Sequence, residues 1–280
     1  MIDLHVHTTY SDGEYSPLEI LKMCNDSGVT KVAITDHGSI EGSKIARYQN
    51  PYDNITVIPG IEFTAIYPVK NGNLHILGYN MDLENKALND ITQAIVKEST
   101  DRFKKLITLL KVHYGFGFEF NDVNEVLESR NNVGRPEIAK LCVDYGYVKS
   151  VDEAFKKYLN PINKLVRRGV ELTDKECIEY ITNAGGIACL AHPIELRKDI
   201  DELREYIKSL LPYGLGAIEV YQSKHDEKYS RALLKIVDEF GLLYSVGSDY
   251  HGPVVTPDFE IGRGMNNNLC MDNATILNKI

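Results

Sequence analysis

Short apolar runs alternate with amphipathic segments along much of the chain. The runs that we interpret as β-strands are Ile2–Val6, Lys31–Thr35, Ile55–Ile58 with a continuation near Ile61–Ala65, Leu74–Gly78, Ile187–Ala191, Ala217–Tyr221 and Leu243–Val246. Helix signals lie between them. This alternation of strand and helix is typical of an α/β fold with a parallel sheet or a barrel.

Two capping boxes predict where helices begin. Ser16-Pro17-Leu18-Glu19 combines an N-cap serine, a proline at the first helical position and a glutamate three residues after the cap. Thr173-Asp174-Lys175-Glu176 repeats the capping-box spacing, and Gly185-Gly186 supplies a stop for that helix.

The pattern changes to helical periodicity from about residue 83 to residue 165. Helix-like segments occupy Asp90–Tyr114, Asp122–Glu128, Pro136–Tyr145 and Val151–Tyr158, and few strand signals interrupt them. We therefore expect an α/β domain in two parts, 1–85 and 166–280, with a helical insertion at 86–165 between them.

The composition is that of an ordinary globular protein, with 43% hydrophobic and 25% charged residues in a chain of 280. No apolar run is long enough to span a bilayer, and the first residues do not resemble a signal peptide. The five cysteines form no C-x-x-C pair and are odd in number, so a disulfide framework or a cysteine zinc site is not expected. These features favour a cytoplasmic protein without membrane contact.

The net charge of −9 limits the possible partners. Proteins that grip long duplex nucleic acid through its backbone carry a basic surface, so such a partner is not expected. An anionic substrate would need bound cations or a local basic pocket. No coiled-coil pattern or exposed apolar repeat argues for assembly, so we expect a monomer.

Histidine and carboxylate residues recur mostly at or just beyond the C-terminal ends of the predicted strands, the rim where catalytic groups gather in barrel enzymes. His5 and His7 form an H-x-H, and side chains two apart on a strand point the same way, so both imidazoles can reach one ion. The sequence therefore predicts one metal site. Its candidate ligands are His5, His7, Asp12, His37, Glu62, His75, His192, Asp249 and His251.

The ligand types restrict the metal without choosing it. Imidazole and carboxylate groups suit Mn, Zn or Fe, and Mg is possible. Asp36, beside His37, is a candidate to orient a ligand from behind rather than to bind a metal itself.

Five segments, which together contain every ligand candidate except His75, resemble the successive motifs of the PHP (polymerase and histidinol phosphatase) superfamily. They are Asp3–Gly13, Ile34–His37, Pro59–Glu62, Ala191–Pro193 and Gly247–Gly252. The resemblance implies a distorted (β/α)7 barrel, the PHP fold, which here would carry the helical insertion. It also implies two or three divalent metal ions at the barrel mouth.

The resemblance implies a grouping of the ligands as well. One ion would be surrounded by His5, His7, Glu62 and Asp249. Glu62 would bridge to a second ion that His75 and His192 hold, and a third ion would be held by Asp12, His37 and His251.

Such a cluster lowers the pKa of a bound water and clamps the attacking and leaving oxygens of a displacement at phosphorus. No G-x-S-x-G elbow occurs, and no cysteine stands visibly beside a histidine. We therefore expect direct attack by metal-bound hydroxide, without a phospho-enzyme intermediate. His225 is a candidate to donate to a substrate phosphate or to protonate the leaving group; the alternative is a plain loop residue.

Basic residues in and after the insertion are candidates for substrate binding. Arg135 lies in Gly134-Arg135-Pro136, and Arg167 follows the insertion. The Gly-Arg-Pro motif resembles a PHP branch that acts on 3′,5′-bisphosphonucleotides and the 5′ ends of short oligonucleotides. Glu137 stands where that branch often has histidine, so the choice of substrate stays open.

Three alternatives to this phosphoesterase remain. One is a phosphomonoesterase of the histidinol phosphatase type, and another is a nuclease that trims longer strands, which would need an aromatic and basic track. The third is a non-catalytic metal-binding module, although structural zinc sites commonly use thiolates.

Overall fold

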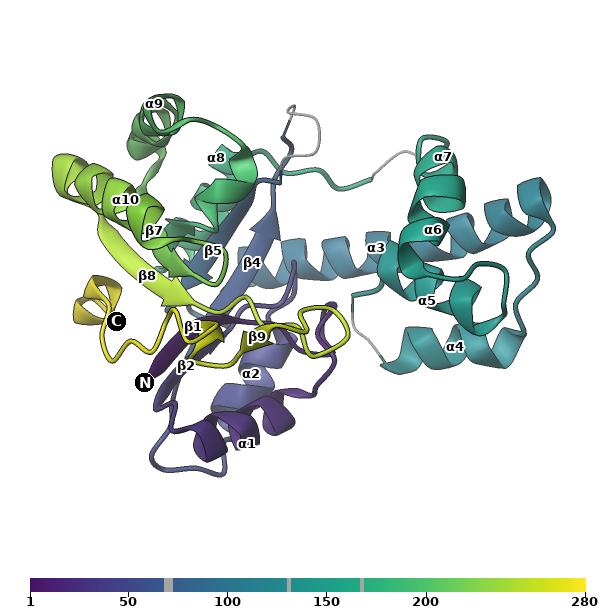
Figure 1. Ribbon diagram of the computed structural model, residues 1–280, viewed down its shortest axis with the longest axis horizontal. Helices are drawn as coiled ribbons and strands as arrows, with labels where there is room; N and C mark the ends of the chain where they lie inside the picture. The colour runs from purple at the N-terminus through teal and green to yellow at the C-terminus, as the bar shows by residue number, and fades with distance from the viewer. Residues whose placement is uncertain (68–72, 130–131, 167–168) are drawn as a thin grey trace.

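The computed structural model describes residues 1–67, 73–129, 132–166 and 169–280 (Figure 1). Strands form the centre of the larger body, and helices α1 and α2 lie on one side of it, with α8, α9 and α10 on another. The long helix α3 leads away from the strands to a second, helical body that contains α4 to α7.

Two sheets make up the larger body. The first is parallel and consists of β1 (Ile2–Val6), β2 (Lys31–Ile34) and β3 (Thr56–Ile58). The second has the order β4-β5-β6-β7-β8 and consists of β4 (Gly60–Thr64), β5 (His75–Tyr79), β6 (Ile187–Leu190), β7 (Leu215–Gln222) and β8 (Leu243–Gly247). A short antiparallel pair, β9 (Phe259–Glu260) and β10 (Gly264–Met265), follows near the C-terminus.

The direction of β5 differs from the sequence-based expectation of a parallel sheet. β5 is antiparallel to both β4 and β6, whereas β6, β7 and β8 run parallel. The connection from β4 to β5 is too short for the helical crossover that a parallel pair requires, so the chain turns back on itself.

The two sheets meet at two seams near the ends of their strands. The backbone N–H of Asp249 donates to the carbonyl of His5 at 2.8 Å, and that of His7 donates to the carbonyl of Tyr250 at 2.9 Å. On the other side, the N–H of Gly38 donates to the carbonyl of Glu62 at 2.8 Å. Among the described residues neither sheet closes on itself, so the structure shows a mixed α/β fold, and the distorted (β/α)7 barrel stays a prediction.

Helices pack against the outside of these sheets. They are α1 (Pro17–Ser27), α2 (Glu41–Tyr48), α8 (Asp174–Asn183), α9 (Ile200–Leu210) and α10 (Glu227–Phe240). Both predicted capping boxes are confirmed, because Ser16 caps α1 through Glu19 and Thr173 caps α8 through Glu176.

The second body has its own apolar core. Its helices are α3 (Lys86–Tyr114), α4 (Phe120–Ser129), α5 (Arg135–Asp144), α6 (Val151–Ala154) and α7 (Asn160–Asn163), with a π-helical turn at Phe155–Leu159. Phe103 and Leu110 of α3 pack there with Ile138 of α5 and with Leu159. The boundaries 86–165 that we predicted for an insertion stay a prediction. Within the described residues, no helix has both the length and the apolar character to cross a membrane.

Candidate metal centre

The nine residues predicted as ligands come together at one end of the strands. His5 lies in β1 and His7 follows it, while Asp249 and His251 follow β8. The hydrogen bonds between the ends of β1 and β8 bring these two pairs side by side. The structure thus places residues from the beginning and the end of the chain around one buried space.

Two carboxylate oxygens of this centre lie at nearly equal distances from two imidazole nitrogens. Nε2 of His5 and Nε2 of His7 are 3.2 Å apart. Oε2 of Glu62 is 3.3 Å from the first and 3.2 Å from the second. Oδ1 of Asp249 is 3.4 Å from each of them. Bonds of about 2.0–2.1 Å to a tetrahedral ion require ligands about 3.3 Å apart, so each carboxylate is spaced to share one divalent cation with His5 and His7.

The other carboxylate oxygen of Glu62 faces a second group. Oε1 of Glu62 lies 2.9 Å from Nδ1 of His75 and 3.0 Å from Nε2 of His192, and the two imidazole nitrogens are 3.2 Å apart. Glu62 therefore presents one oxygen to each of two groups, which is the arrangement of a bridging carboxylate.

The third group surrounds Asp12. Oδ1 of Asp12 is 3.3 Å from Nε2 of His251, and Oδ2 is 3.8 Å from Nε2 of His37. His7 also offers a ring nitrogen to this group, with Nδ1 at 3.7 Å from Asp12. In addition, Nδ1 of His37 lies 3.1 Å from Glu62, so the groups share members rather than dividing cleanly.

Several atoms of the centre are buried without a regular hydrogen bond to any described group. They include Oδ1 of Asp12, Nδ1 of His37 and Oε2 of Glu62. Burying a carboxylate oxygen without a hydrogen-bond partner costs roughly several kcal/mol, unless a nearby cation compensates its negative charge. The donor set therefore fits metal ions held by imidazoles and carboxylates.

The charges of the centre require positive partners. Burial opposes a charged imidazole, but hydrogen bonds to Asp249 and Glu62 outweigh it and raise the pKa of His7 to about 10. At His192 burial is likewise outweighed by the hydrogen bond to Glu62 and by the charge of Glu62, which raise the pKa to about 9. At His37 burial prevails and lowers the pKa to about 4. Without metal ions, protons on some imidazoles have to balance the buried carboxylates.

A family model described as the PHP domain matches residues 3–241 of the chain. The chain belongs to the PHP domain family. This confirms the resemblance seen in the sequence. The match includes seven of the nine ligand candidates, and the other two, Asp249 and His251, lie beyond residue 241.

Relatives of this PHP-domain protein cover nearly its whole length. A 5′-3′ exoribonuclease of Haemophilus influenzae is 28% identical over 90% of this chain and 90% of its own. A 3′,5′-nucleoside bisphosphate phosphatase of Chromobacterium violaceum is 27% identical over 90% of this chain and 87% of its own.

Two solved structures are similar in fold. One is a candidate metal-dependent phosphoesterase of Bifidobacterium adolescentis, with a TM-score of 0.75 and 25% identity over 98% of this chain and 91% of its own. The other is an amidohydrolase of Chromobacterium violaceum with bound sulfate and no metal, with a TM-score of 0.74 and 26% identity over 90% of this chain and 88% of its own.

Sequence reasoning missed Glu219, a fully buried carboxylate in β7. Its Oε1 lies 2.9 Å from Nδ1 of His5, and its Oε2 accepts the backbone N–H of His192 at 2.7 Å. It thus connects two ligand candidates from behind and leaves Nε2 of His5 for a cation. The signal was present, because Glu219 is the single acid in an otherwise apolar strand centre, Ala217–Val220.

The backbone at the centre is shaped to bring the ligands together. His192 and Asp249 have positive φ angles of 23° and 59°, which residues other than glycine rarely adopt. Gly247 lies so close to β1 that a Cβ there would be 2.2 Å from Cβ of His5. A larger residue at Gly247 would push His5 away from its partners.

Asp36 supports the loop that follows β1. Its Oδ1 accepts the backbone N–H of Thr8 and the hydroxyl of Ser11, both at 2.7 Å, and its Oδ2 accepts the hydroxyl of Thr8 at 2.7 Å. Ser11 in turn contacts Nδ1 of His7 at 3.3 Å. Through these bonds Asp36 acts on the His7 side of the centre rather than on its neighbour His37.

His225 is buried at the end of β7, with its Nδ1 2.9 Å from the carbonyl of Val220. Because that nitrogen donates to a carbonyl, Nε2 carries the lone pair. Burial lowers the pKa of His225, so the ring is neutral near pH 7. A neutral ring can accept a hydrogen bond or a proton. The role of His225 as a donor to a substrate phosphate or to the leaving group stays a prediction.

One of the two arginines predicted to bind substrate lies in the helical body. Arg135, at the start of α5, stacks over the ring of Phe155 at 5.3 Å and donates to Oδ1 of Asn160 at 3.1 Å. Arg167 lies outside the described residues.

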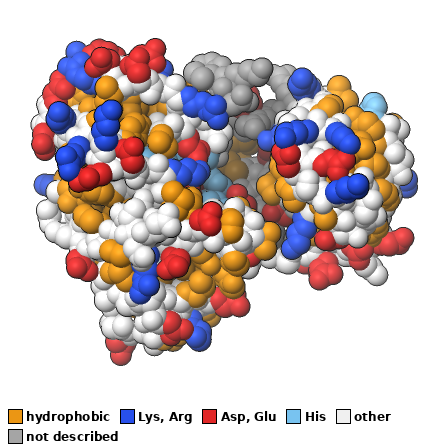
Figure 2. Space-filling view, viewed as in Figure 1, with side chains coloured by type: hydrophobic (Ala, Val, Ile, Leu, Met, Phe, Trp, Pro, Cys, Tyr) orange, Lys and Arg blue, Asp and Glu red, His pale blue; other side chains and the backbone are white. Residues whose placement is uncertain are grey.

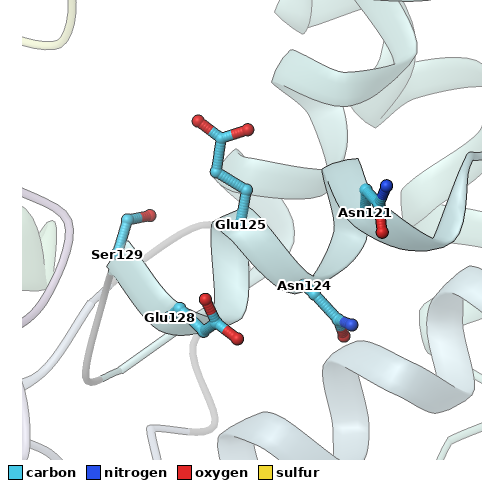
Figure 3. Close-up of a pocket in the computed structure, with 5 residues that line it drawn as sticks. All are labelled: Asn121, Asn124, Glu125, Glu128 and Ser129. Atoms are coloured by element: carbon cyan, nitrogen blue, oxygen red, sulfur yellow. The ribbon is translucent and has the colours of Figure 1, made fainter.

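A hollow of about 510 Å³ lies along α4, far from the ligand candidates in the chain (Figure 3). Its lining includes none of the nine residues, and two of its five side chains, Glu125 and Glu128, are acidic. These carboxylates disfavour a phosphorylated ligand at this surface.

Proposed function

We propose that this PHP-domain protein is a metal-dependent phosphoesterase that hydrolyses a phosphate monoester of a 3′,5′-bisphosphonucleotide or a short oligonucleotide. One observation carries the proposal. Imidazole and carboxylate atoms of nine residues converge in one buried space at spacings that suit divalent cations. The relatives named as a bisphosphate phosphatase and as exoribonucleases support the substrate class.

Two or three divalent ions, Mn, Zn, Fe or Mg, would be held by the nine residues. When bound, such ions supply an activated water and neutralise charge on the phosphoryl group. The protein's own part is to hold the ligands still: Glu219 fixes His5, and Asp36 fixes the loop after β1. Burial keeps bulk water from the side chains of His5, His7 and Glu62.

The four buried cysteines do not offer an alternative nucleophile. Burial raises the pKa of Cys142 to about 11 and raises those of Cys24, Cys177 and Cys189 further. A thiol in this state is a poor nucleophile at neutral pH. Direct attack of water on phosphorus, without a covalent phospho-enzyme, is therefore the mechanism that we propose, and a trapped covalent phosphate would contradict it.

Substrate contacts by Arg135, Arg167 and His225 remain part of the proposal. A guanidinium offers two parallel donors to a second phosphate, and the neutral ring of His225 would accept a hydrogen bond from a substrate hydroxyl. A histidinol phosphatase activity is the second candidate function, and hydrolysis of histidinol phosphate compared with adenosine 3′,5′-bisphosphate decides between them.

The test is hydrolysis of adenosine 3′,5′-bisphosphate before chelation, after chelation, and after Mn, Zn, Fe or Mg is restored. We expect chelation to abolish phosphate release and at least one metal to restore it. His7→Ala should remove activity while the far-ultraviolet circular dichroism is retained. His113→Ala, which changes an exposed histidine at the end of α3, is the matched control and should keep full activity. Normal turnover in chelated protein or in His7→Ala would refute the proposal.

A further inference from the structure

A cavity of about 190 Å³ lies between the two bodies, beside the metal centre. The sheet side contributes Ala65, Ile66 and Leu172, and the helical side contributes Ile95, Glu98 and Arg102. His37, a ligand candidate, also lines it. Figure 2 shows the molecule hollowed between the two bodies, with histidine side chains visible in the hollow.

The helical body touches the metal centre at this cavity. The side-chain amide of Asn132 donates to the carbonyl of His37 at 2.7 Å. Next to it, a Cβ on Gly38 would lie 2.7 Å from Cγ2 of Ile95, and Gly38 has a φ of +58°. Only glycine lets α3 approach the loop so closely, so the helix forms one wall of the space that opens beside His37.

The size of the cavity suits one part of a substrate. Pockets that enclose a whole drug-sized ligand measure about 300–1,000 Å³. A cavity of about 190 Å³ is smaller than that and fits a single ring system. The phosphate of the same molecule would then lie outside it, on the side of the metal ligands.

The lining suits an uncharged ring with hydrogen-bond donors. Ile66, which is 47% exposed, and Ile95 offer apolar surface from opposite bodies. The charged lining residues are Glu98, Glu171 and Arg102, besides His37, so carboxylates outnumber guanidinium groups. A phosphate would be repelled there, whereas a ring amino group could donate to a carboxylate.

We propose that this cavity holds the nucleobase of the substrate, with Ile66 and Ile95 against the ring. The inference rests on the proposed phosphoesterase function, because it assumes that the phosphate lies at the metal centre. It adds that the helical body helps to select nucleotides over other phosphate esters.

The test compares two substrates in the metal-loaded protein. Adenosine 3′,5′-bisphosphate has a base to place in the cavity, and glycerol phosphate has none. Ile66→Glu should lower kcat/KM for the nucleotide about tenfold or more, the scale of a lost apolar contact in a specificity pocket, and leave glycerol phosphate within about twofold. Ile66→Asn, which adds no charge, should produce a smaller loss in the same direction.

Ile200→Glu is the matched control, because Ile200 is a partly exposed isoleucine, 36% accessible, at the start of α9 and is not a lining residue of the cavity. It should alter neither substrate. Equal losses on both substrates in Ile66→Glu, or no loss on either, would overturn the proposal. Thermal unfolding of each variant establishes that the protein is folded.

A binding measurement separates this inference from the proposed function. Adenosine, which has no phosphate, should bind the wild-type protein in calorimetry and bind Ile66→Glu at least about tenfold more weakly. If adenosine binds as expected but no phosphate ester is hydrolysed, the proposed function fails and the base site stands. If esters are hydrolysed but adenosine binds both proteins equally or neither, the base site fails alone.

Discussion

Two imidazoles of the metal centre have one ring nitrogen fixed by the protein itself. Nδ1 of His5 lies 2.9 Å from Glu219, and Nδ1 of His251 lies 2.9 Å from the carbonyl of Asp249. A hydrogen bond from Nδ1 leaves the lone pair of Nε2 directed at the shared space. The ligand atoms are therefore preorganised by neighbours, and this makes the role of single residues testable.

Replacing Glu219 with glutamine should weaken metal binding without unfolding the protein. The amide keeps the shape of the side chain but removes the charge behind His5 and cannot accept both hydrogen bonds in the same way. Loss of such a supporting carboxylate typically costs about 10–100-fold in metal affinity. Competition with a chromogenic chelator measures this directly.

Glu227→Gln, an exposed change in α10, is the matched control for this experiment. It should bind metal like the wild type. An unchanged affinity in Glu219→Gln would show that the bond to His5 does not position a ligand.

Metal affinity should rise with pH between about 6 and 9. In the metal-free protein the pKa of His7 is raised to about 10 and that of His192 to about 9, so both rings hold protons at pH 7. A cation must displace these protons, and their loss becomes easier as pH rises towards those values. Calorimetry in buffers of different ionisation enthalpy should show proton release, whereas proton uptake or a pH-independent affinity would contradict the assignment.

At the scale of elements, local patterns predicted the strands and helices that carry the centre. The apolar runs predicted the ends of β1 at Val6 and of β8 at Gly247 to within one residue. Ser16 and Thr173 mark helix starts, because their capping hydrogen bonds form within a single turn. The expectation of a parallel sheet was wrong for β5, because the pairing of a strand depends on a partner distant in the chain. The length of the connection after Thr64 was the usable clue.

The start of α5 carries the most specific prediction for an element. Arg135 lies over Phe155, the first residue of a π-helical turn, a feature that is frequent at functional sites. Arg135→Ala should lower kcat/KM for a bisphosphorylated nucleotide about tenfold or more, as a lost charged hydrogen bond does, and affect a simple monoester less. Steady-state kinetics on both substrates measure the difference.

Lys140→Ala, an exposed change on the same helix, controls for loss of positive charge in general. It should leave both substrates unaffected. Equal losses on both substrates in Arg135→Ala would mean that the guanidinium supports the fold of the helical body instead of a second phosphate.

For the whole molecule, the convergence of nine distant residues could be predicted because one rule, strand ends at a common rim, applied to most of them. Glu219 escaped that rule because it lies inside β7 and acts through His5. The cavity beside His37 could not be predicted either, since it depends on how α3 packs against Gly38 across the two bodies. Packing between separate bodies leaves little trace in local patterns.

Anomalous diffraction from crystals of the manganese-loaded protein tests the central claim most directly. We predict two or three anomalous peaks in the space enclosed by the nine residues, one of them within bonding distance of His5, His7, Glu62 and Asp249. Peaks elsewhere on the molecule, with none in that space, would contradict the account.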